Sequence, residues 1–469
     1  MSRQAFVRPG YLPAAALLSA AGCASDGIGP AIAPVPVIEQ SAVAANPHNV
    51  LSAVVVVRAQ DADSVAVRFG IAGQPLTSAT PAVRPAAESF RVPVLGLLSA
   101  TPYRLQAVAY GGGHAGAGDT LALTTGTLPD DLPAYVTEGT DPAPGYVVFA
   151  ALQYGLVIDN TGRVVWYRHF PDGLGINFQA QPDGRYAALP PPPQTGQPAA
   201  WVELDALGDV VRTLTCAHGL APRFHDLLAQ PDGSYWILCD DTRTIDLSAA
   251  GGAAAARVTG TVVQHFDATG ALQFEWSVFD HFAITDLPPA ELAVPSINWT
   301  HGNALDLDTD GNLLVSFRNL SEITKIDTGT GVVIWRMGGV RNQFTFEDIT
   351  PPAFARQHGV RSTSPGTLIL LDNLGDPGDS RAKRYSYDAA AYTARLMSAY
   401  GSQPPITAQL GGTTQPIPGG RVLVSFGSGA RVAEYDAAGN ERWRIMDPGY
   451  VFRAQRIESL YAPGVGSAR

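Results

Sequence analysis

The sequence predicts an all-β protein in which a six-bladed β-propeller follows a small β-sandwich. The 469 residues include 49 glycines and 37 prolines, and only 16% are charged, which favours many short strands joined by turns over long helices. Short apolar runs that alternate with a two-residue period begin near residue 37. From about residue 145 onward, two kinds of turn alternate along the chain, as expected of a repeat architecture.

The N-terminal 23 residues predict export from a bacterial cell. Arg3 and Arg8 precede the apolar run "YLPAAALLSAAG", which has the length of a signal-peptide core and is too short to span a bilayer. The run ends in "SAAGC" at Cys23, and small residues before a cysteine are similar to a lipoprotein lipobox. We therefore expect a periplasmic or membrane-anchored lipoprotein that contacts the membrane only through a lipid on Cys23, with simple cleavage nearby as the alternative. Residues 24–36, rich in Pro and Ala, are predicted to be a tether.

Residues 37–128 predict the sandwich domain. The runs "VLSAVVVVRAQ", "SVAVRFGI", "SFRVPVL", "PYRLQAVAY" and "DTLALTTGTLP" are short strands separated by turn signals. The segment "LLSATPYRLQAVAY" resembles the fibronectin type III pattern, in which Tyr103 would take the place of the tyrosine-corner residue.

Residues 140–469 predict the propeller. The first turn type occurs in "QPDGRYAAL", "QPDGSYWIL", "DTDGNLLVSF", "TSPGTLILL" and "IPGGRVLVSF". The second occurs in "IDNTGRVVWY", "LDALGDVVRTL", "FDATGALQFEW", "IDTGTGVVIWRM", "YDAAAYTARLM" and "YDAAGNERWRI". Two hairpins per unit give four strands per unit, and a ring of six such units leaves few strand edges exposed.

Two bulk properties limit the partners and the redox state. The net charge is −11 with no long run of Lys and Arg, which argues against nucleic acid as a partner.

Beyond Cys23, only Cys216 and Cys239 remain. In a chain bound for an oxidising compartment we expect a disulfide between them, the alternative being two buried free thiols.

Three of the nine histidines occupy similar positions relative to a turn glycine. His225 and His358 each lie eight residues before the glycine of a first-type turn, and His301 lies ten residues before its own. The first strand of each blade lines the central channel, so equal offsets bring these side chains to one funnel. The same offset in the last blade falls beside Thr413 and Thr414.

The residue types alone leave two kinds of chemistry open. Three imidazoles can hold Zn²⁺ with an open fourth position, for which Asp226 is the nearby carboxylate that could support a ligand. Alternatively, they can act without metal as nucleophile and acid–base groups on an anionic substrate. Arg318 and Asn303, expected in the same funnel, favour an oxyanion substrate.

The run "INWTHGNALDLDTDGNLLVSFRNLSEITKIDTGTGVVIWRMGG", followed by "FARQHGV", "LLDNLG" and "SRAKRYSYD", closely resembles the bacterial arylsulfate sulfotransferase family. The resemblance covers about residues 145–447 and is most specific between Asn298 and Asp388. It implies an exported six-bladed propeller with a small N-terminal β-domain, which needs no nucleotide sulfate donor. It also implies a ping-pong reaction, in which a histidine takes the sulfuryl group from a phenolic sulfate and passes it to a phenol, with no metal or dissociable cofactor.

Matching the family's motifs assigns a role to each candidate residue. The nucleophile falls on His358, the "H-x-N" motif on His301 and Asn303, and the arginine after the next strand on Arg318. The other residues implied are an "H-D" histidine, which matches His225, and a threonine, which matches Thr413 or Thr414. His301 or His225 would then protonate the departing phenolate.

The sequence departs from the family pattern at one position beside the nucleophile. Many members have Asp or Asn after the nucleophile, where this chain has Gly359; its blade insertions are also short. Two other classes of function stay open: a non-catalytic lipoprotein propeller that binds a partner, and a hydrolase or lyase with a metal on the three histidines. A homodimer is a further expectation.

Overall fold

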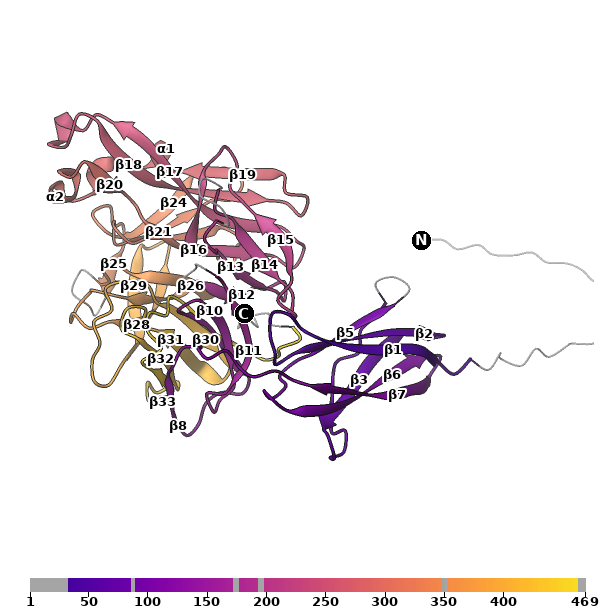
Figure 1. Ribbon diagram of the computed structural model, residues 1–469. Coiled ribbons are helices and arrows are strands. Elements are labelled where there is room, and N and C mark those ends of the chain that lie inside the picture. Colours follow the sequence, from indigo (N-terminus) through magenta and orange to yellow (C-terminus); the bar gives the residue numbers. More distant parts are fainter. Residues whose placement is uncertain are drawn as a thin grey trace, which may run out of the picture.

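The structure is a computed structural model that describes residues 33–85, 89–171, 177–192, 198–347, 349 and 353–462. Strands make up 51% of it and helices 4%, which confirms the predicted all-β class. The strands before residue 125 gather at one end of the molecule and the later strands at the other (Figure 1). The predicted signal peptide with Cys23, and most of the tether, lie outside the described residues. None of the described helices has the length and apolar character needed to cross a bilayer.

The N-terminal strands form a sandwich of two antiparallel sheets around one apolar core. One sheet contains β1 (Val37–Ala45), β2 (Ala53–Gln60) and β5 (Phe90–Val94); the other contains β4 (Ser78–Ala79), β3 (Ser64–Ile71), β6 (Pro102–Gly111) and β7 (His114–Thr124). The hydroxyl of Tyr103 accepts a hydrogen bond of 2.9 Å from the backbone N–H of Leu98, which is the tyrosine-corner geometry of such domains.

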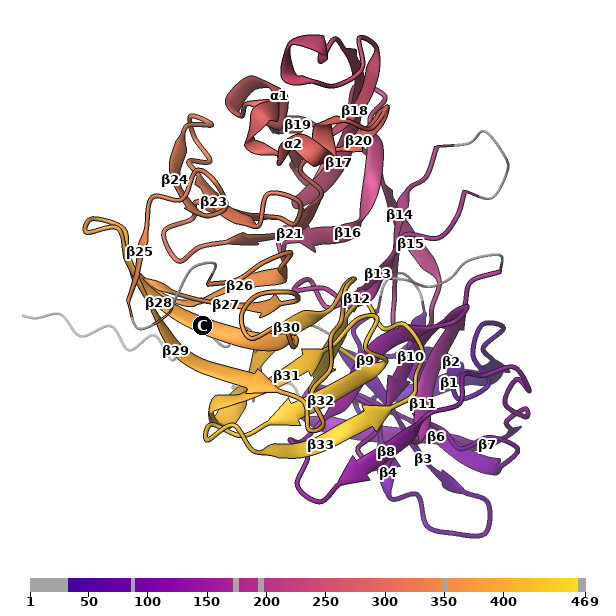
Figure 2. The same ribbon diagram turned by 90° about the vertical axis from the view of Figure 1, so that its left-hand side faces the viewer.

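Six further sheets follow one another along the described chain after the sandwich (Figure 2). The first sheet contains β34 (Ala454–Ile457), β9 (Tyr146–Ala151), β10 (Tyr154–Ile158) and β11 (Val164–His169). The second contains β12 (Phe178–Ala180), β13 (Tyr186–Ala188), β14 (Trp201–Leu204) and β15 (Val210–Leu214). The third contains β16 (Ala221–Ala229), β17 (Tyr235–Ile245), β18 (Ala256–Phe266) and β19 (Leu272–Ser277), with β20 (Ser296–Asn298) beside β18. The next is β21 (Gly302–Leu307), β22 (Leu313–Phe317), β23 (Glu322–Ile326) and β24 (Val333–Gly338). The last two are β26 (His358–Ser364), β27 (Thr367–Asp372), β28 (Arg381–Asp388) and β29 (Thr393–Gly401), with β25 (Thr345–Glu347) beside β29; and β30 (Thr413–Ile417), β31 (Arg421–Ser425), β32 (Arg431–Tyr435), β33 (Glu441–Met446) and β8 (Val136–Gly139).

Strands from the two ends of the propeller segment complete each other's sheets. The late strand β34 pairs with β9 and becomes the innermost strand of the first sheet, while the early strand β8 pairs with β33 at the outer edge of the last sheet. The chain ends are therefore held together by backbone hydrogen bonds, which closes the ring and covers two strand edges.

Side chains on the inner strands bridge neighbouring sheets. Each inner strand except one presents a carboxylate or amide oxygen that accepts the backbone N–H of the next inner strand in the ring. The bridges join Gln455 to Ala180 (2.8 Å), Gln181 to Ala229 (2.9 Å), Asp226 to Leu305 (3.1 Å), Asp306 to Ser362 (2.8 Å) and Gln415 to Arg456 (2.6 Å). At the sixth junction the hydroxyl of Thr414 lies 3.5 Å from the carbonyl of Gly359. Because the channel faces of inner strands have no strand beside them, these side chains satisfy backbone groups that would otherwise be buried and unpaired.

Replacing Gln455 by Leu tests these bridges. The substitution leaves the N–H and carbonyl of Ala180, both bonded to the Gln455 amide, without partners in a buried position. We expect the free energy of unfolding to fall by about 1–3 kcal/mol, measured by chemical denaturation. Gln74→Leu, at an exposed position, is the control, and equal losses in the two variants would contradict the role of the bridge.

Candidate active site

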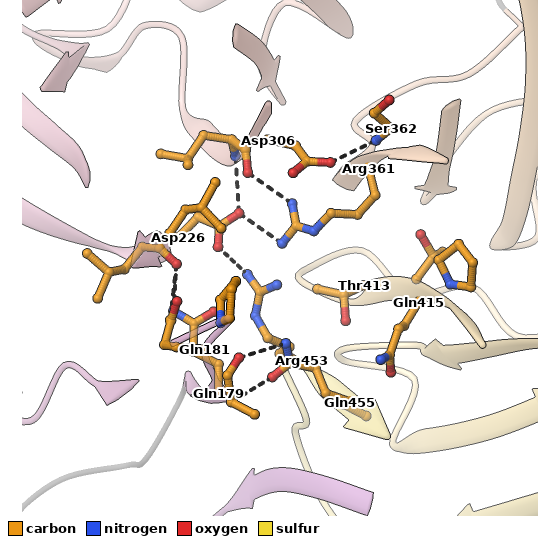
Figure 3. A pocket seen from close by; sticks show the side chains of 18 of the residues that line it. Gln179, Gln181, Asp226, Asp306, Arg361, Ser362, Thr413, Gln415, Arg453 and Gln455 are labelled. Carbon is orange, nitrogen blue, oxygen red and sulfur yellow. Dashed lines mark hydrogen bonds and ion pairs between the residues drawn. The ribbon is translucent and has the colours of Figure 1, made fainter. Parts of the chain in front are cut away.

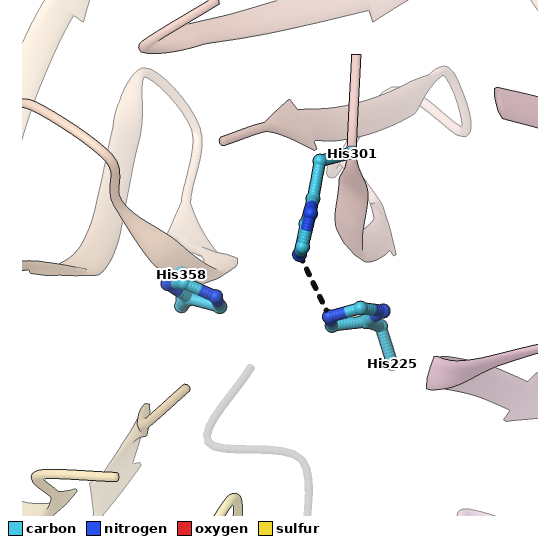
Figure 4. A group of neighbouring side chains, drawn as sticks. All are labelled: His225, His301 and His358. Atoms are coloured by element: carbon cyan, nitrogen blue, oxygen red, sulfur yellow. Dashed lines mark hydrogen bonds between the residues drawn. The ribbon is translucent and has the colours of Figure 1, made fainter. Parts of the chain in front are cut away.

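His225, His301 and His358 come from three consecutive sheets and meet at one end of the channel (Figure 4). One nitrogen from each ring lies within 4.8 Å of the corresponding nitrogens of the other two. His225 and His301 are in direct contact, with their Nε2 atoms 3.0 Å apart. The ring of His358 is centred 6.3 Å from each of the other two rings, so it faces the pair across a gap.

The local backbone explains how these side chains reach one place. His358 is the first residue of β26, and His225 lies in β16 where the pairing with β17 is interrupted by a bulge. His301 precedes β21 and has a φ of +52°, a left-handed conformation that is uncommon outside glycine and often found at functional sites. Arg318 follows β22, and its backbone N–H donates to the carbonyl of His301 at 3.1 Å, so the predicted return of Arg318 to this funnel is seen.

A hydrogen bond to Asn373 decides which nitrogen of His358 is free. The Asn373 amide nitrogen donates to the carbonyls of Ala408 and Gly411, which turns its Oδ1 toward His358 Nδ1 at 2.8 Å. Because that oxygen can only accept, His358 must carry its proton on Nδ1. The lone pair is then on Nε2.

A hydrogen bond from Arg223 decides the protonation of the other two rings. Arg223 Nε donates to His225 Nδ1 at 3.0 Å, and a guanidinium has no lone pair to accept with. His225 therefore carries its proton on Nε2 and donates it to His301 Nε2, so that the proton of His301 is on Nδ1. This requires the side-chain amide of Asn298, 2.8 Å from His301 Nδ1, to present its oxygen there.

Burial keeps all three rings neutral. It lowers the pKa of His358 from 6.5 to about 4, with the hydrogen bond to Asn373 acting against burial and the charge of Arg318 adding to it. Burial, then the charge of Arg223, lowers the pKa of His301 to about 2 and that of His225 well below 6.5. Neutral imidazoles at neutral pH are therefore the resting state of the site.

Arginines surround the histidines with positive charge. Arg318 is half buried, donates to Asn319 Oδ1 and the carbonyl of Gln409, and its Nε has no partner. Arg356 donates to the same Asn319 oxygen and pairs with Glu291. Burial, then the charge of Arg356, lowers the pKa of Arg318. Two guanidinium groups that share one amide oxygen beside the histidines favour the arrival of an anion.

Aromatic rings border the same cluster. Phe224 stacks on His225 with ring centres 4.0 Å apart, and Phe452 lies 5.5 Å from His225 and 6.3 Å from His358. Trp299 and Phe317, the other aromatic residues near the motifs, are in the apolar core. No motif marks Phe452, which belongs to the segment just before the C-terminal strand β34.

Asn303 does not lie where the substrate hypothesis requires it, and Asp226 does not lie where the zinc hypothesis requires it. The Asn303 amide is fully buried and donates at 2.7 Å to the carbonyl of Gln357, next to His358. It thus positions the strand that carries His358. Asp226 pairs with Arg361 and Arg453 and not with the ring of any of the three histidines.

Thr413 and Thr414 line a separate cavity of about 510 Å³ inside the inner strands (Figure 3). Its walls also include the charged group formed by Asp226, Arg361 and Arg453, but none of the three histidines. The hydroxyl of Thr413 is buried and has no partner. Thr413 nevertheless reaches the histidine strand through Gly359, where an added Cβ would lie 2.9 Å from the Thr413 Cα. This close approach to the Thr413 backbone, at a φ of +64°, favours glycine at this position.

Cys216 and Cys239 form a disulfide in the structure. It joins Cys216, in the segment before β16, to Cys239 in β17. Strand β16 carries His225 and pairs with β17.

Two site residues were not predicted from the sequence, although a signal for them exists. They are Asn373 and Asp240, the carboxylate that pairs with Arg223. Asp240, Arg318 and Asn373 each lie seven residues after the turn glycine of their unit. The second strand returns the chain to the histidine end of the channel, so this offset marks a second ring of site residues. Arg223 and Asn298 have no comparable signal.

Comparison with known proteins assigns the family. A family model described as arylsulfotransferase (ASST) matches residues 221–448. Residues 221–448 belong to the arylsulfotransferase family. The matched segment includes the three histidines, Arg318 and Asn373.

Similarity to solved structures is more distant. A protein of unknown function from Bacteroides caccae is 11% identical, with a TM-score of 0.43 over 66% of this chain and 98% of its own. A streptogramin B lyase is 12% identical, with a TM-score of 0.37 over 66% and 86%. At these TM-scores the likeness adds nothing to the assignment of a function. No curated protein matches this chain.

The lowered pKa of His358 predicts sensitivity to acid. The unfolded chain takes up a proton near pH 6.5, whereas folded His358 resists it until about pH 4, so stability is lost as the pH falls through this window. His358→Gln should reduce the slope of unfolding free energy against pH there by up to about 1.4 kcal/mol per pH unit. Denaturation curves at several pH values measure this, with exposed His114→Gln as the control. An unchanged slope in His358→Gln would contradict the neutral resting state.

Proposed function

We propose that this arylsulfotransferase moves a sulfuryl group from a phenolic sulfate ester to a phenol in a ping-pong reaction through a sulfohistidine at His358. The observation that carries the proposal is the free lone pair on His358 Nε2. The amide of Asn373 holds the proton on the other nitrogen, burial keeps the ring neutral, and Arg318 lies beside it. These are the properties that a nitrogen nucleophile needs toward an anionic electrophile.

In the first half-reaction, His358 Nε2 attacks the sulfur atom and the bond from sulfur to the phenolic oxygen breaks. The aryl oxygen leaves as phenolate, and the ring, now bonded to sulfur at Nε2 and to hydrogen at Nδ1, carries a positive charge beside the negative sulfuryl group. The Asn373 oxygen stabilises that ring through the Nδ1 hydrogen bond. Arg318, whose Nε is without a partner, stabilises the sulfuryl oxygens, as cations do in phosphoryl transfer.

The His225–His301 pair faces the nucleophile and supplies the proton for the phenolate. With pKa values lowered in the resting site, neither ring is an acid on its own. The negative charge of a bound aryl sulfate raises those pKa values, because a nearby opposite charge favours the imidazolium, and the pair takes up one proton from solvent as the aryl sulfate binds. In the second half-reaction the acceptor phenol gives a proton back to this pair as its oxygen attacks sulfur, and His358 is released.

A metal-dependent hydrolase or lyase is a weaker hypothesis, because His225 carries a proton on the nitrogen that would bind the metal. A partner-binding propeller without catalysis remains as the alternative that the next experiment tests. The export, lipid anchor and homodimer expected from the sequence are parts of the proposal.

The covalent intermediate is accessible to mass spectrometry. Brief exposure to 4-nitrophenyl sulfate without acceptor should add one SO₃ group to the protein, on the peptide that contains His358, with a matching burst of nitrophenolate. His358→Ala should show neither signal, while His114→Ala, changed at an exposed histidine, should behave as the wild type. A folded wild-type protein without adduct or burst would make the binding propeller the better hypothesis.

The role of Arg318 predicts a loss of rate. Arg318→Met removes the cation beside the sulfuryl oxygens and should lower kcat/KM for an aryl sulfate by about 10²–10³. Arg318→Lys should restore part of the rate, since it keeps the charge but not the fork of donors. Steady-state kinetics with exposed Arg104→Met as control measure both, and an unchanged rate in Arg318→Met would exclude this role.

A further inference from the structure

Arg223 is a buried cation whose side chain contacts the ring of His225. The proposed reaction gives this arginine no role. Its side chain is 7% exposed. Nε donates to His225 Nδ1 at 3.0 Å, Nη1 pairs with Asp240, and Nη2 lies 3.4 Å from the side-chain amide of Asn298. Asp240 comes from the neighbouring strand β17, so the guanidinium is fixed from two sides.

We propose that Arg223 is a positioning residue that locks the proton of His225 on Nε2 and thereby keeps transition-metal ions out of the histidine cluster. A neutral imidazole that binds a metal through Nε2 must carry its proton on Nδ1. In this protein Nδ1 faces the N–H of Arg223, and two hydrogens cannot occupy that 3.0 Å contact. His225 is therefore unable to become a metal ligand at Nε2 while Arg223 is in place.

The spacing of the three rings otherwise suits a metal ion. One nitrogen of each ring is within 4.8 Å of the others, all three rings are neutral, and the free Nε2 of His358 is already in the ligand tautomer. Three such imidazoles form a common zinc site. A periplasmic enzyme with a histidine nucleophile would lose activity if Zn²⁺ occupied its lone pair, so a residue that blocks the third ligand protects the reaction.

The same proton orders the pair for catalysis. His225 Nε2–H donates to His301 Nε2 at 3.0 Å, which holds both rings facing His358. This second part rests on the proposed sulfuryl transfer, whereas exclusion of metal is a property of the resting protein and is tested without substrate.

The test compares Co²⁺ binding by the wild type and by Arg223→Met/Asp240→Asn. Asp240→Asn is included because the Asp240 carboxylate, left without Arg223, would itself attract a metal ion. Visible absorption of Co²⁺ in a four-coordinate histidine site is the readout, with isothermal titration for the affinity. We expect the double variant to bind one Co²⁺ at least roughly 10- to 100-fold more tightly than the wild type, the range by which residues that orient histidine ligands change metal affinity.

Two controls separate the cluster from other sites and from misfolding. Adding His301→Gln to the double variant should abolish the new Co²⁺ spectrum. In ¹⁵N-histidine-labelled wild type, with His225→Gln used for assignment, the Nδ1 of His225 should show the shift of an unprotonated nitrogen; this measurement needs no Arg223 variant to fold.

Each alternative result overturns the proposal. Equal Co²⁺ affinity in wild type and double variant would show that Arg223 is no barrier, and absence of binding in both would show that the cluster is not a potential metal site. A protonated Nδ1 on His225 would refute the assigned tautomer. If instead metal exclusion is found but 4-nitrophenyl sulfate gives no adduct, the proposed function fails while the role of Arg223 stands.

Discussion

The ring of side-chain bridges between inner strands is the constraint on which the active site depends. Each blade is complete within itself, so its outer strands could tilt or slide against the next blade with little loss of backbone pairing. The bridges from Gln181, Asp226 and Asp306 prevent this at the channel, because each ties one inner strand to the next by its backbone. His358 begins β26, His301 precedes β21 and His225 lies within β16, so their separations follow from the ring.

Asp226 shows how closely this scaffold and the site are coupled. One of its oxygens accepts the N–H of Leu305 and a hydrogen bond from Arg361, while the other pairs with Arg453 from the C-terminal strand β34. Arg453 also donates to the carbonyl of His225. A single carboxylate thus fixes the backbone of the histidine beside it, and three blades and the closing strand meet at this point.

The electrostatics of the site come from an excess of cations around rings that stay neutral. Arg223, Arg318 and Arg453 all lower the pKa of one or more of the three histidines, after burial. The outcome is a nucleophile that remains unprotonated and a positive surrounding that selects anions. The same cations would repel a divalent metal ion, in agreement with the role given to Arg223.

The sequence by itself determined the β class, the repeat, the family and the three histidines, because turn glycines, strand periodicity and motif spacing are local properties that survive without coordinates. A repeat with equal offsets also implies that equivalent side chains converge, which placed His225, His301, His358 and Arg318 together. Only the tertiary structure decided which nitrogen of each ring is free, since Asn373 and Arg223 act on the histidines through single hydrogen bonds that no spacing rule describes. The tertiary structure also showed that Asn303 contacts the strand of His358 and that Thr413 lines a cavity without the histidines. Spacing alone does not decide these contacts, because successive side chains of a strand point to opposite sides and the residues that they face come from other blades.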